Sequence, residues 1–295
     1  MLDDEINARL ASIRHVALDM DGTIYKGQTL FGFTHAFLAC MRNLGIGVTF
    51  LTNNSSKSTK DYAEHLARVG LGVQPDQIVT AGRVTIEYLQ TQYPEHSRLF
   101  ILGTESLREE FSQSGFTVVS GDETDQPDAV VIGFDTGLAY PRLCSAAYWI
   151  NRGIPFIATH PDLVCPTDQQ TVLVDCGAIC SCLTAATGRS PDIVLGKPHP
   201  SMLAGILSRH DLEPQQLAMV GDRLSTDIAM AHASGALGVL VLTGEATVQD
   251  TENCAMPPDL VLDDLGELGR IMDAQARRCE RRSSAVKPGI QGMDL

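Results

Sequence analysis

The chain has 295 residues, 44% of them hydrophobic, and its 22 basic against 36 acidic side chains give a formal net charge of -14. This length exceeds that of a usual single domain, so we expect two domains. The acidic balance argues against a nucleic-acid partner, because nucleic-acid surfaces depend on clustered Lys and Arg. No apolar run approaches the roughly 18 to 20 residues of a membrane span, and the start MLDDEINARL is acidic where a signal peptide is basic, so we expect a cytoplasmic protein without a membrane partner.

Short β-branched runs alternate with amphipathic stretches along the chain, a pattern typical of an α/β fold with a parallel sheet. The runs predicted as strands of one sheet are 15–19, 47–52, 192–196, 217–222 and 238–243. Helices are predicted between them, at 57–70 with Ser58 or Thr59 as N-cap and Gly70 as the stop, at 199–212 and at 225–235. A second alternating set lies in the middle of the chain, with strands at 98–103, 116–121, 128–135 and 154–160 and a helix at 142–153.

We interpret the middle set as a separate α/β domain inserted into a doubly wound, Rossmann-like core with a parallel sheet. The predicted boundaries are 1–80 for the first part of the core, 81–188 for the inserted domain and 189–272 for the second part of the core. Residues 273–295 are polar and rich in turn-forming residues, so we expect a flexible C-terminal tail there.

Two aspartates, Asp19 and Asp21, follow the first predicted strand in HVALDMDGT and repel each other at this spacing. A second pair follows a later strand in LAMVGDRLSTD, with Asp222 at the strand tip and Asp227 near the start of the next helix. Ligands of open parallel sheets bind beyond the carboxyl ends of the strands, so we expect these carboxylates to converge there. Such a set needs a hard cation, and Mg²⁺ is the first choice, because it accepts carboxylates together with waters and a substrate phosphate.

Two further strand ends carry groups suited to an anion. FLTNNSS places Thr52, Asn53, Asn54 and Ser55 just before a helix, where hydroxyl and backbone N–H groups bind phosphate oxygens. LGKPHP supplies Lys197, a compact charge that can neutralise a transferring group. Taken alone, a TNNSS segment is more often a turn with an N-cap, and a single lysine before proline is more often solvated surface. Turns, N-caps and solvated side chains do not readily explain why all four segments (the two aspartate pairs, FLTNNSS and LGKPHP) each end a predicted strand.

Eight cysteines are scattered through apolar segments without a paired framework. The stretch CGAICSC lacks the paired CxxC spacing and nearby histidines of a zinc site, and Cys176 and Cys180 are one helical turn apart. We therefore expect buried, reduced thiols rather than a metal or redox cluster.

The ordered set DMDGT (19–23), LTNN (51–54), GKP (196–198) and GDRLSTD (221–227) resembles the catalytic motifs of the haloacid dehalogenase-like (HAD) superfamily of aspartate-nucleophile phosphatases. The block between the second and third motifs resembles the large α/β cap of class II members. The segments LDMDGTIYKG, FLTNNSSKS, ATHPD, GAIC and GKPHP resemble class IIA, the NagD-like or p-nitrophenyl phosphatase branch, which also contains pyridoxal phosphate phosphatases. The resemblance covers about residues 13–265 and implies the HAD fold with an inserted cap domain.

The resemblance also implies roles for individual residues. Asp19 would be the nucleophile that forms an aspartyl-phosphate, and Asp21 the acid and base that serves the leaving group and then the water. Mg²⁺ would be held by Asp19, the backbone carbonyl of Asp21 and Asp222, with Asp227 as a further carboxylate. Thr52 and the Asn53 backbone would hold the phosphoryl oxygens, and Lys197 would offset their charge. Further candidates for substrate or phosphate binding are Asn54, Ser55 and His160.

The expected reaction is Mg²⁺-dependent hydrolysis of a small phosphomonoester, such as a sugar phosphate, a nucleoside monophosphate or pyridoxal phosphate. Dehalogenase members lack the second aspartate, and phosphomutases usually carry a small helical cap after the first motif, for which the segment after Thr23 is too short. The remaining alternatives are a phosphotransferase or phosphomutase of the same fold and a catalytically silent binding scaffold. The DxD order and the inserted block argue against a receiver-type signalling domain.

Specificity is expected in the cap. THPDLVCPT (159–167) brings His160, Asp162 and Thr167 into a segment that resembles the family's substrate-facing loop, although a solvated, proline-stiffened loop explains it equally well. Asp175 departs from the small residues usual before this GAIC segment, and would disfavour very anionic substrates or bind a sugar hydroxyl. Members of this branch often dimerise through the cap, so a homodimer formed there is a further expectation.

Overall fold

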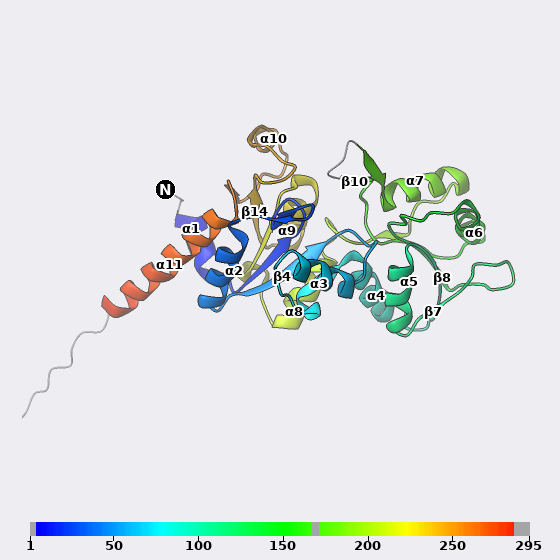
Figure 1. Ribbon diagram of the computed structural model, residues 1–295, viewed down its shortest axis with the longest axis horizontal. Helices are drawn as coiled ribbons and strands as arrows, with labels where there is room; N and C mark the ends of the chain where they lie inside the picture. Colours follow the sequence, from blue (N-terminus) through cyan, green and yellow to red (C-terminus); the bar gives the residue numbers. More distant parts are fainter. Residues whose placement is uncertain (1–3, 167–170, 286–295) are drawn as a thin grey trace, which may run out of the picture.

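The computed structural model describes residues 4–166 and 171–285, which form two α/β lobes side by side (Figure 1). The first lobe is built on six parallel strands in the order β15-β14-β13-β1-β4-β5. These strands are β1 (His15–Asp19), β4 (Gly47–Thr52), β5 (Ile78–Thr80), β13 (Leu217–Gly221), β14 (Leu237–Val241) and β15 (Leu260–Leu262).

Helices cover both faces of this sheet, because residues along each strand alternate between two apolar clusters. Val16 and Leu18 of β1 pack in one cluster with α2 and α11, whereas Ala17 packs in the other with α8 and α9. The helices of this lobe are α1 (Asp4–Ser12), α2 (Thr34–Asn43), α3 (Thr59–Arg68), α8 (Ser201–His210), α9 (Ala229–Ser234), α10 (Val248–Glu252) and α11 (Leu265–Ala285). The hairpin of β2 (Tyr25–Lys26) and β3 (Thr29–Leu30) follows β1.

The second lobe is built on five parallel strands in the order β12-β9-β8-β6-β7. They are β6 (Arg98–Leu102), β7 (Thr117–Val118), β8 (Ala129–Ile132), β9 (Phe156–Ala158) and β12 (Ile193–Val194). Its helices are α4 (Ala81–Gln92), α5 (Glu105–Gln113), α6 (Tyr140–Asn151) and α7 (Cys176–Thr187). An antiparallel hairpin of β10 (Val164–Pro166) and β11 (Val172–Val174) precedes α7.

The chain crosses from one lobe to the other along α4. Val84 on this helix joins an apolar cluster of the first lobe, whereas Ile86 and Leu89 join a cluster of the second. The helix thus contributes to both cores, and the first lobe is the core sheet and the second the cap.

Local signals placed several elements correctly. Ser58 is the N-cap of α3 and forms a capping box with Asp61, as the sequence predicts. Cys176 and Cys180 are buried one turn apart on α7, and no disulfide joins the cysteines whose side chains are described, although Cys144 and Cys182 are exposed.

Two expectations differ from the structure. The strand predicted at 192–196 in the core is β12, which pairs with β9 and extends the cap sheet past the expected boundary at 188. The tail expected from 273 is helical as far as Ala285, because α11 continues past the part that packs on α2. Residues 286–295 lie outside the described part of the chain.

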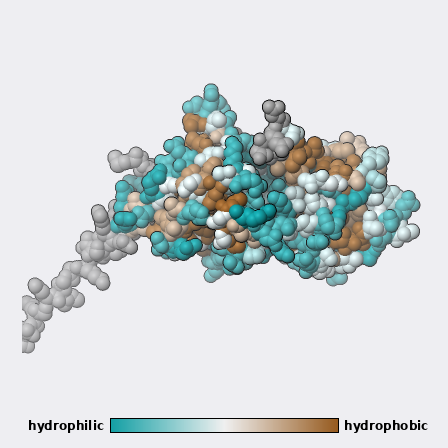
Figure 2. Space-filling view, in the orientation of Figure 1, coloured by the Kyte–Doolittle hydropathy of each residue, from teal (hydrophilic) through white to brown (hydrophobic). Residues whose placement is uncertain are grey.

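Apolar side chains also reach the surface of the cap. Leu163, directly before β10, is exposed, and so are Val164, Val172, Leu173 and Val174 of the β10–β11 hairpin. Figure 2 shows hydrophobic surface gathered over the part of the cap that carries β10 and α7. Among the described helices, none combines the length and apolar composition that crossing a membrane requires.

Candidate active site

The carboxyl ends of two neighbouring core strands bring three aspartates together. Asp19 ends β1, and Asp222 directly follows β13, which pairs with β1 in parallel. Asp227 lies in the π-helical turn Leu224–Ile228 that follows. One ligand oxygen of each carboxylate lies within 4.8 Å of the others. Asp21 lies two residues beyond Asp19, and its side chain is open to solvent.

Lys197 holds this cluster together. Its side chain is buried, and its Nζ donates to Asp19 Oδ1 in a short contact and to Asp227 Oδ1 at 2.7 Å. Burial favours the neutral amine, but Asp19 and Asp227 outweigh it and raise the pKa of Lys197. The lysine therefore carries its positive charge beside both carboxylates.

The remaining carboxylates are under electrostatic strain. Burial, followed by the charge of Asp19, raises the pKa of Asp222 to about 7. Although Asp21 is exposed at the surface, the surrounding protein shields part of its carboxyl group from water, and this partial desolvation, followed by the charge of Asp19, raises its pKa to about 6. Burial also raises the pKa of Asp227 to about 6, against the pull of Lys197. One lysine does not neutralise this set, so the site favours a further cation.

Asp222 supplies a specific place for that cation. Its Oδ2 accepts from the backbone N–H of Glu245 at 2.7 Å, whereas its Oδ1 is buried and has no hydrogen-bond partner in the described chain. A buried carboxylate oxygen without a donor is costly. Together with Asp19, this oxygen fits a hard divalent cation such as Mg²⁺.

Glycines make room for these carboxylates. A Cβ on Gly244 would lie 1.8 Å from Asp222 Oδ2, and one on Gly221 would lie 2.2 Å from Asp227 Cγ. Real Cβ contacts are never this short, so only glycine permits the observed approach. The sequence reasoning missed this contribution, although Gly244, directly after the strand predicted at 238–243, is a visible turn signal.

The loop after β4 uses its side chains mainly to hold itself and the cap. Thr52 Oγ1 accepts from the Asn54 N–H, and Asn54 Oδ1 accepts from the Ser56 N–H. The Ser55 hydroxyl is fully buried between Thr159 and the Phe134 N–H of the cap. The side chains of Asn54 and Ser55, both predicted to bind phosphate, therefore form hydrogen bonds within the loop and to the cap.

Asn53 contacts both the Lys197 backbone and the cap. Its Oδ1 accepts from the Lys197 N–H at 2.7 Å, and its Nδ2 donates to the Lys197 carbonyl at 2.9 Å. The same Nδ2 lies 3.2 Å from each carboxylate oxygen of Asp162 in the cap.

The cap residues predicted for specificity are tied to one another. His160 is fully buried; its Nδ1 bonds Thr159 and its Nε2 bonds Asp175 Oδ1 at 2.9 Å. Asp175 is the N-cap of α7 and is also buried, so its carboxylate supports the helix and His160. The expectation that Asp175 faces a substrate is not supported by these contacts. Thr167 lies outside the described residues.

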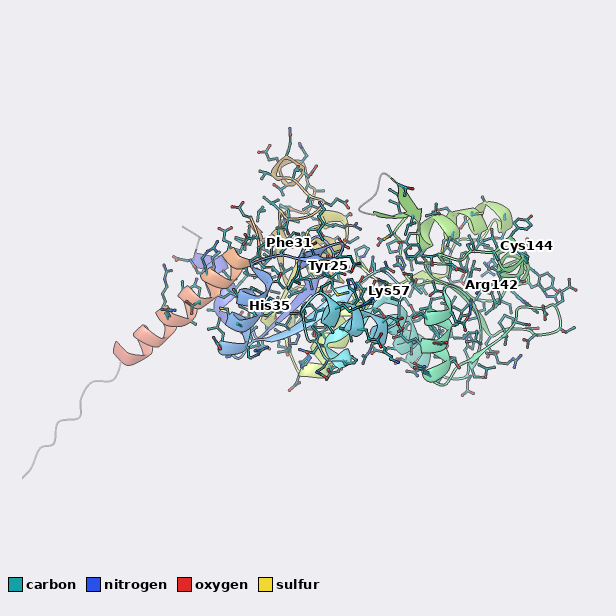
Figure 3. The ribbon with its side chains drawn as sticks, in the orientation of Figure 1. Tyr25, Phe31, His35, Lys57, Arg142 and Cys144 are labelled. Carbon is teal, nitrogen blue, oxygen red and sulfur yellow. The ribbon has the colours of Figure 1, made fainter. Side chains whose placement is uncertain are left out.

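The two sheets present their carboxyl ends to each other. The residues just after β8 and β9 contact the loop after β4, and Thr104, after β6, donates to the Ser56 carbonyl. Figure 3 places Lys57, the next residue of that loop, at the junction of the lobes. The aspartates therefore lie at the edge of the core sheet that faces the cap.

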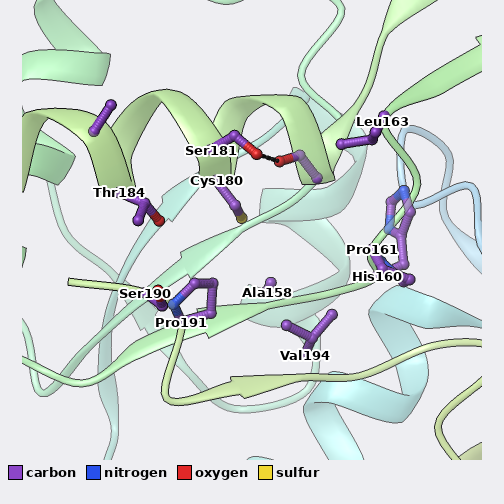
Figure 4. A pocket seen from close by; sticks show the side chains of 12 residues that line it. Ala158, His160, Pro161, Leu163, Cys180, Ser181, Thr184, Ser190, Pro191 and Val194 are labelled. Carbon is purple, nitrogen blue, oxygen red and sulfur yellow. Dashed lines mark hydrogen bonds between the residues drawn. The ribbon is translucent and has the colours of Figure 1, made fainter. Parts of the chain in front are cut away.

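A groove of about 510 Å³ runs along α7 within the cap. Figure 4 shows His160 and Pro161 at one end of this groove, with Cys180, Ser181 and Thr184 along the helix wall and Val194 opposite. None of the core aspartates lines it, so the groove is separate from the carboxylate cluster.

Arg223 is a cation that the sequence reasoning did not single out. Its Nε bonds Glu245 at 2.9 Å, and its pKa is raised because Glu245, Asp222 and Asp162 outweigh burial. Its position between two motif aspartates was visible in GDRLSTD, but its partner Glu245 is distant in sequence.

Comparison with known proteins agrees with this geometry. A family model described as haloacid dehalogenase-like hydrolase matches residues 16–117, and a HAD-hydrolase-like model matches residues 194–268. The acid sugar phosphatase of Staphylococcus aureus is 33% identical over 250 residues, which are 85% of this chain and 94% of that protein. The chain belongs to the haloacid dehalogenase-like hydrolases.

Solved structures identify this HAD hydrolase more closely. The 4-nitrophenylphosphatase of Thermotoga maritima is 38% identical, with a TM-score of 0.84 over 89% of this chain and 98% of that one. The glycerol phosphate phosphatase of Mycobacterium tuberculosis, solved in complex with magnesium, is 31% identical, with a TM-score of 0.81 over 89% of this chain and 77% of that one. The expected NagD-like, p-nitrophenyl phosphatase branch and the HAD fold with a cap domain are confirmed, and the protein is a phosphoric monoester hydrolase.

Proposed function

We propose that this HAD phosphatase is a Mg²⁺-dependent hydrolase of a small phosphorylated metabolite, acting through an aspartyl-phosphate at Asp19. The observation that carries the proposal is the pairing of Asp19 with Lys197 beside the unpartnered Oδ1 of Asp222. The charge of Lys197 lets the Asp19 carboxylate approach a phosphate dianion, which would otherwise repel it.

In the first half-reaction, an oxygen of Asp19 attacks phosphorus while the bond to the leaving oxygen breaks. Asp21 donates a proton to that oxygen, and its solvent-accessible side chain suits this transfer. Thr52 and the Asn53 backbone hold the phosphoryl oxygens. In the second half-reaction, Asp21 accepts a proton from water as the water attacks phosphorus, which releases phosphate and restores Asp19.

Asp19, the Asp21 carbonyl and Asp222 would hold Mg²⁺, with Asp227 nearby. Bound there, the ion supplies positive charge for the phosphoryl oxygens. Asp227 serves chiefly to hold Lys197, because its Oδ1 bonds Nζ and its Oδ2 accepts from the Arg223 N–H at 3.1 Å.

Sugar phosphates and other small phosphomonoesters suit a site that a lobe of this size covers. The names of the S. aureus and M. tuberculosis relatives support a sugar phosphate or a glycerol phosphate over the nucleotide and pyridoxal candidates. A phosphomutase is disfavoured because the cap is the large α/β insertion between the second and third motifs.

The test is phosphate release from p-nitrophenyl phosphate and a panel of sugar, glycerol, nucleoside and pyridoxal phosphates, with Mg²⁺ or EDTA. Mg²⁺-dependent release that Asp222→Asn abolishes supports the proposal, and the panel ranks the substrates. Full release in EDTA, or none from the folded protein with Mg²⁺, would overturn it.

The cap homodimer also stays a proposal. Its support is the exposed apolar hairpin of β10 and β11. Light scattering of the wild type and of Val174→Lys tests it: a dimer that the lysine dissociates supports this interface, and a wild-type monomer removes it.

A further inference from the structure

The loop Thr159–Asp162 is hydrogen-bonded both to the rest of the cap and to the core. Thr159 bonds Ser55 of the core at 3.1 Å and His160 at 2.9 Å, and His160 bonds Asp175 at the start of α7. The Asp162 carbonyl accepts from the Gly177 N–H at 2.8 Å, and a Cβ on Gly177 would lie 2.1 Å from the Pro161 carbonyl oxygen. The position of Asp162 is therefore fixed relative to the body of the cap.

On the core side, Asn53 is fixed just as firmly. Its side chain is 6% exposed and forms two hydrogen bonds with the backbone of Lys197. Gly196 permits this approach: it has a φ of +70°, and a Cβ there would lie 2.8 Å from the Thr159 carbonyl oxygen and 2.9 Å from Asn53 Oδ1.

The amide of Asn53 joins the cap and the core. Nδ2 donates both to the Lys197 carbonyl and to the carboxylate of Asp162, so a single planar amide is bonded to the cap and to the backbone of the catalytic lysine. Withdrawal of the cap would take the Asp162 oxygens away from this amide and leave one of its N–H donors without the acceptor that it has in the closed arrangement.

We propose that Asp162 and Asn53 form a closure latch, in which seating of the cap places Asp162 on Asn53 and thereby aligns Lys197 for phosphoryl transfer. Asp162 is thus a positioning residue that acts through Asn53. The inference rests on the proposed function for its kinetic part only, because the contact itself is measurable without turnover.

The kinetic test is a double-mutant cycle on p-nitrophenyl phosphate hydrolysis. Asp162→Ala should lower kcat about tenfold with little change in KM, because the latch acts after substrate has bound. In an Asn53→Ala background the same change should have little further effect. Asp162→Asn keeps an amide oxygen as acceptor and should recover most of kcat, and Glu123→Gln, an exposed carboxyl of the cap, is the matched control.

A cost of Asp162→Ala that is equal in both backgrounds, or an Asp162→Asn variant as slow as Asp162→Ala, would overturn the latch. The second result would show that the charge of Asp162 acts on substrate directly.

Hydrogen exchange on the same variants, without substrate, separates the latch from the proposed reaction. The Lys197 N–H is held by Asn53, so Asp162→Ala should raise exchange in the peptide around residue 197 while Asp162→Asn and Glu123→Gln leave it near the wild-type rate. Unchanged exchange in Asp162→Ala would contradict the latch. If the wild type is inactive on every phosphomonoester, the proposed function is rejected, but the exchange measurement still tests whether Asp162 acts on Lys197 through Asn53.

Discussion

Lys197 is the residue on which the charge balance of the site depends. It contacts two carboxylates while Asp222 stands close to the same cluster. Loss of the Lys197 charge would leave buried carboxylates without a compensating cation. This would lower the stability of the fold and raise the barrier of a reaction that brings in a phosphate dianion.

Lys197→Met should therefore lower kcat at least about 100-fold, since one preorganised charge at a transferring group is typically worth that much. Steady-state hydrolysis and a thermal melt measure the two effects, and the melting temperature should also fall because Asp227 loses its partner. Lys60→Met, an exposed lysine on α3, is the control. A kcat within threefold of wild type would contradict the role of Lys197.

His15 gives a pH dependence that is independent of catalysis. The residue is 4% exposed, and its ring bonds Thr49 Oγ1 at 2.8 Å and lies tilted by 33° against the ring of His210, with centroids 4.4 Å apart. Burial, helped by His210, lowers the pKa of His15 to about 4. Between pH 6.5 and 4 the unfolded chain takes up a proton that the native state does not, so this group makes stability fall as the pH falls through that window.

His15→Gln, which can still bond Thr49, should flatten this part of the stability profile. The wild type should lose up to about 3 kcal/mol more than the variant between pH 7 and pH 4. Urea unfolding at several pH values measures the difference, with the exposed His35→Gln as control; His35 lies on the core surface in Figure 3. Parallel profiles for wild type and His15→Gln would contradict the buried neutral imidazole.

At the scale of elements, the site depends on strand ends and on the glycines beside them. Gly244 follows β14 and lies against the Asp222 carboxylate, which also accepts from the Glu245 N–H. The loop after β14 therefore fixes the rotamer of a proposed metal ligand.

Gly244→Ala should displace Asp222 and weaken Mg²⁺ binding at least about tenfold, because the added methyl group has no room and overpacking costs about 1–3 kcal/mol. Titration calorimetry with Mg²⁺ measures the loss. Gly32→Ala is the matched control, since a Cβ there meets nothing within 4 Å. Equal Mg²⁺ affinity in both variants would remove Asp222 from the metal site.

The same scale explains what could be predicted from the sequence. Asp19, Lys197 and Asp222 each end an apolar run, and parallel strands share one carboxyl edge, so their convergence followed from the pattern. The membership of β12 could not be predicted, because a two-residue strand between the lobes carries no signal of which sheet it joins.

Side-chain partners distant in sequence were also beyond prediction. Ser55 and Asn54 are residue types common in phosphate-binding loops, yet the Ser55 hydroxyl forms hydrogen bonds with Thr159 and Phe134 of the cap instead. Asp175 was expected to face the substrate. An aspartate is also the residue type favoured at a helix N-cap, and Asp175 caps α7 and bonds the buried His160.

At the scale of the whole molecule, two parallel sheets meet through their carboxyl ends, and the chain crosses between them along α4 and again after β12. Core and cap share polar contacts rather than a large apolar interface at the loop after β4, an arrangement that suits lobes that separate to admit substrate.

Mg²⁺ should stabilise the whole chain against heat, because its site brings buried carboxylates of like charge together. At 100 times the dissociation constant the gain is about 2.7 kcal/mol, which corresponds to a rise in melting temperature of about 5 °C or more. Melts with Mg²⁺ and with EDTA test this, and Asp222→Asn should abolish the shift. An equal shift in Asp222→Asn would place the ion elsewhere.

The proposed reaction depends above all on the phosphorylation of Asp19. Trypsin releases both candidate carboxylates in one peptide, residues 15–26, because cleavage follows Arg14 and Lys26. Acid quenching during turnover followed by borohydride reduction converts a phosphorylated aspartate into homoserine, which tandem mass spectrometry places along the peptide. Homoserine at position 19 and none at 21, lost in Asp19→Asn, is the predicted result; homoserine at 21, or none at either position during steady turnover with Mg²⁺, would contradict the account.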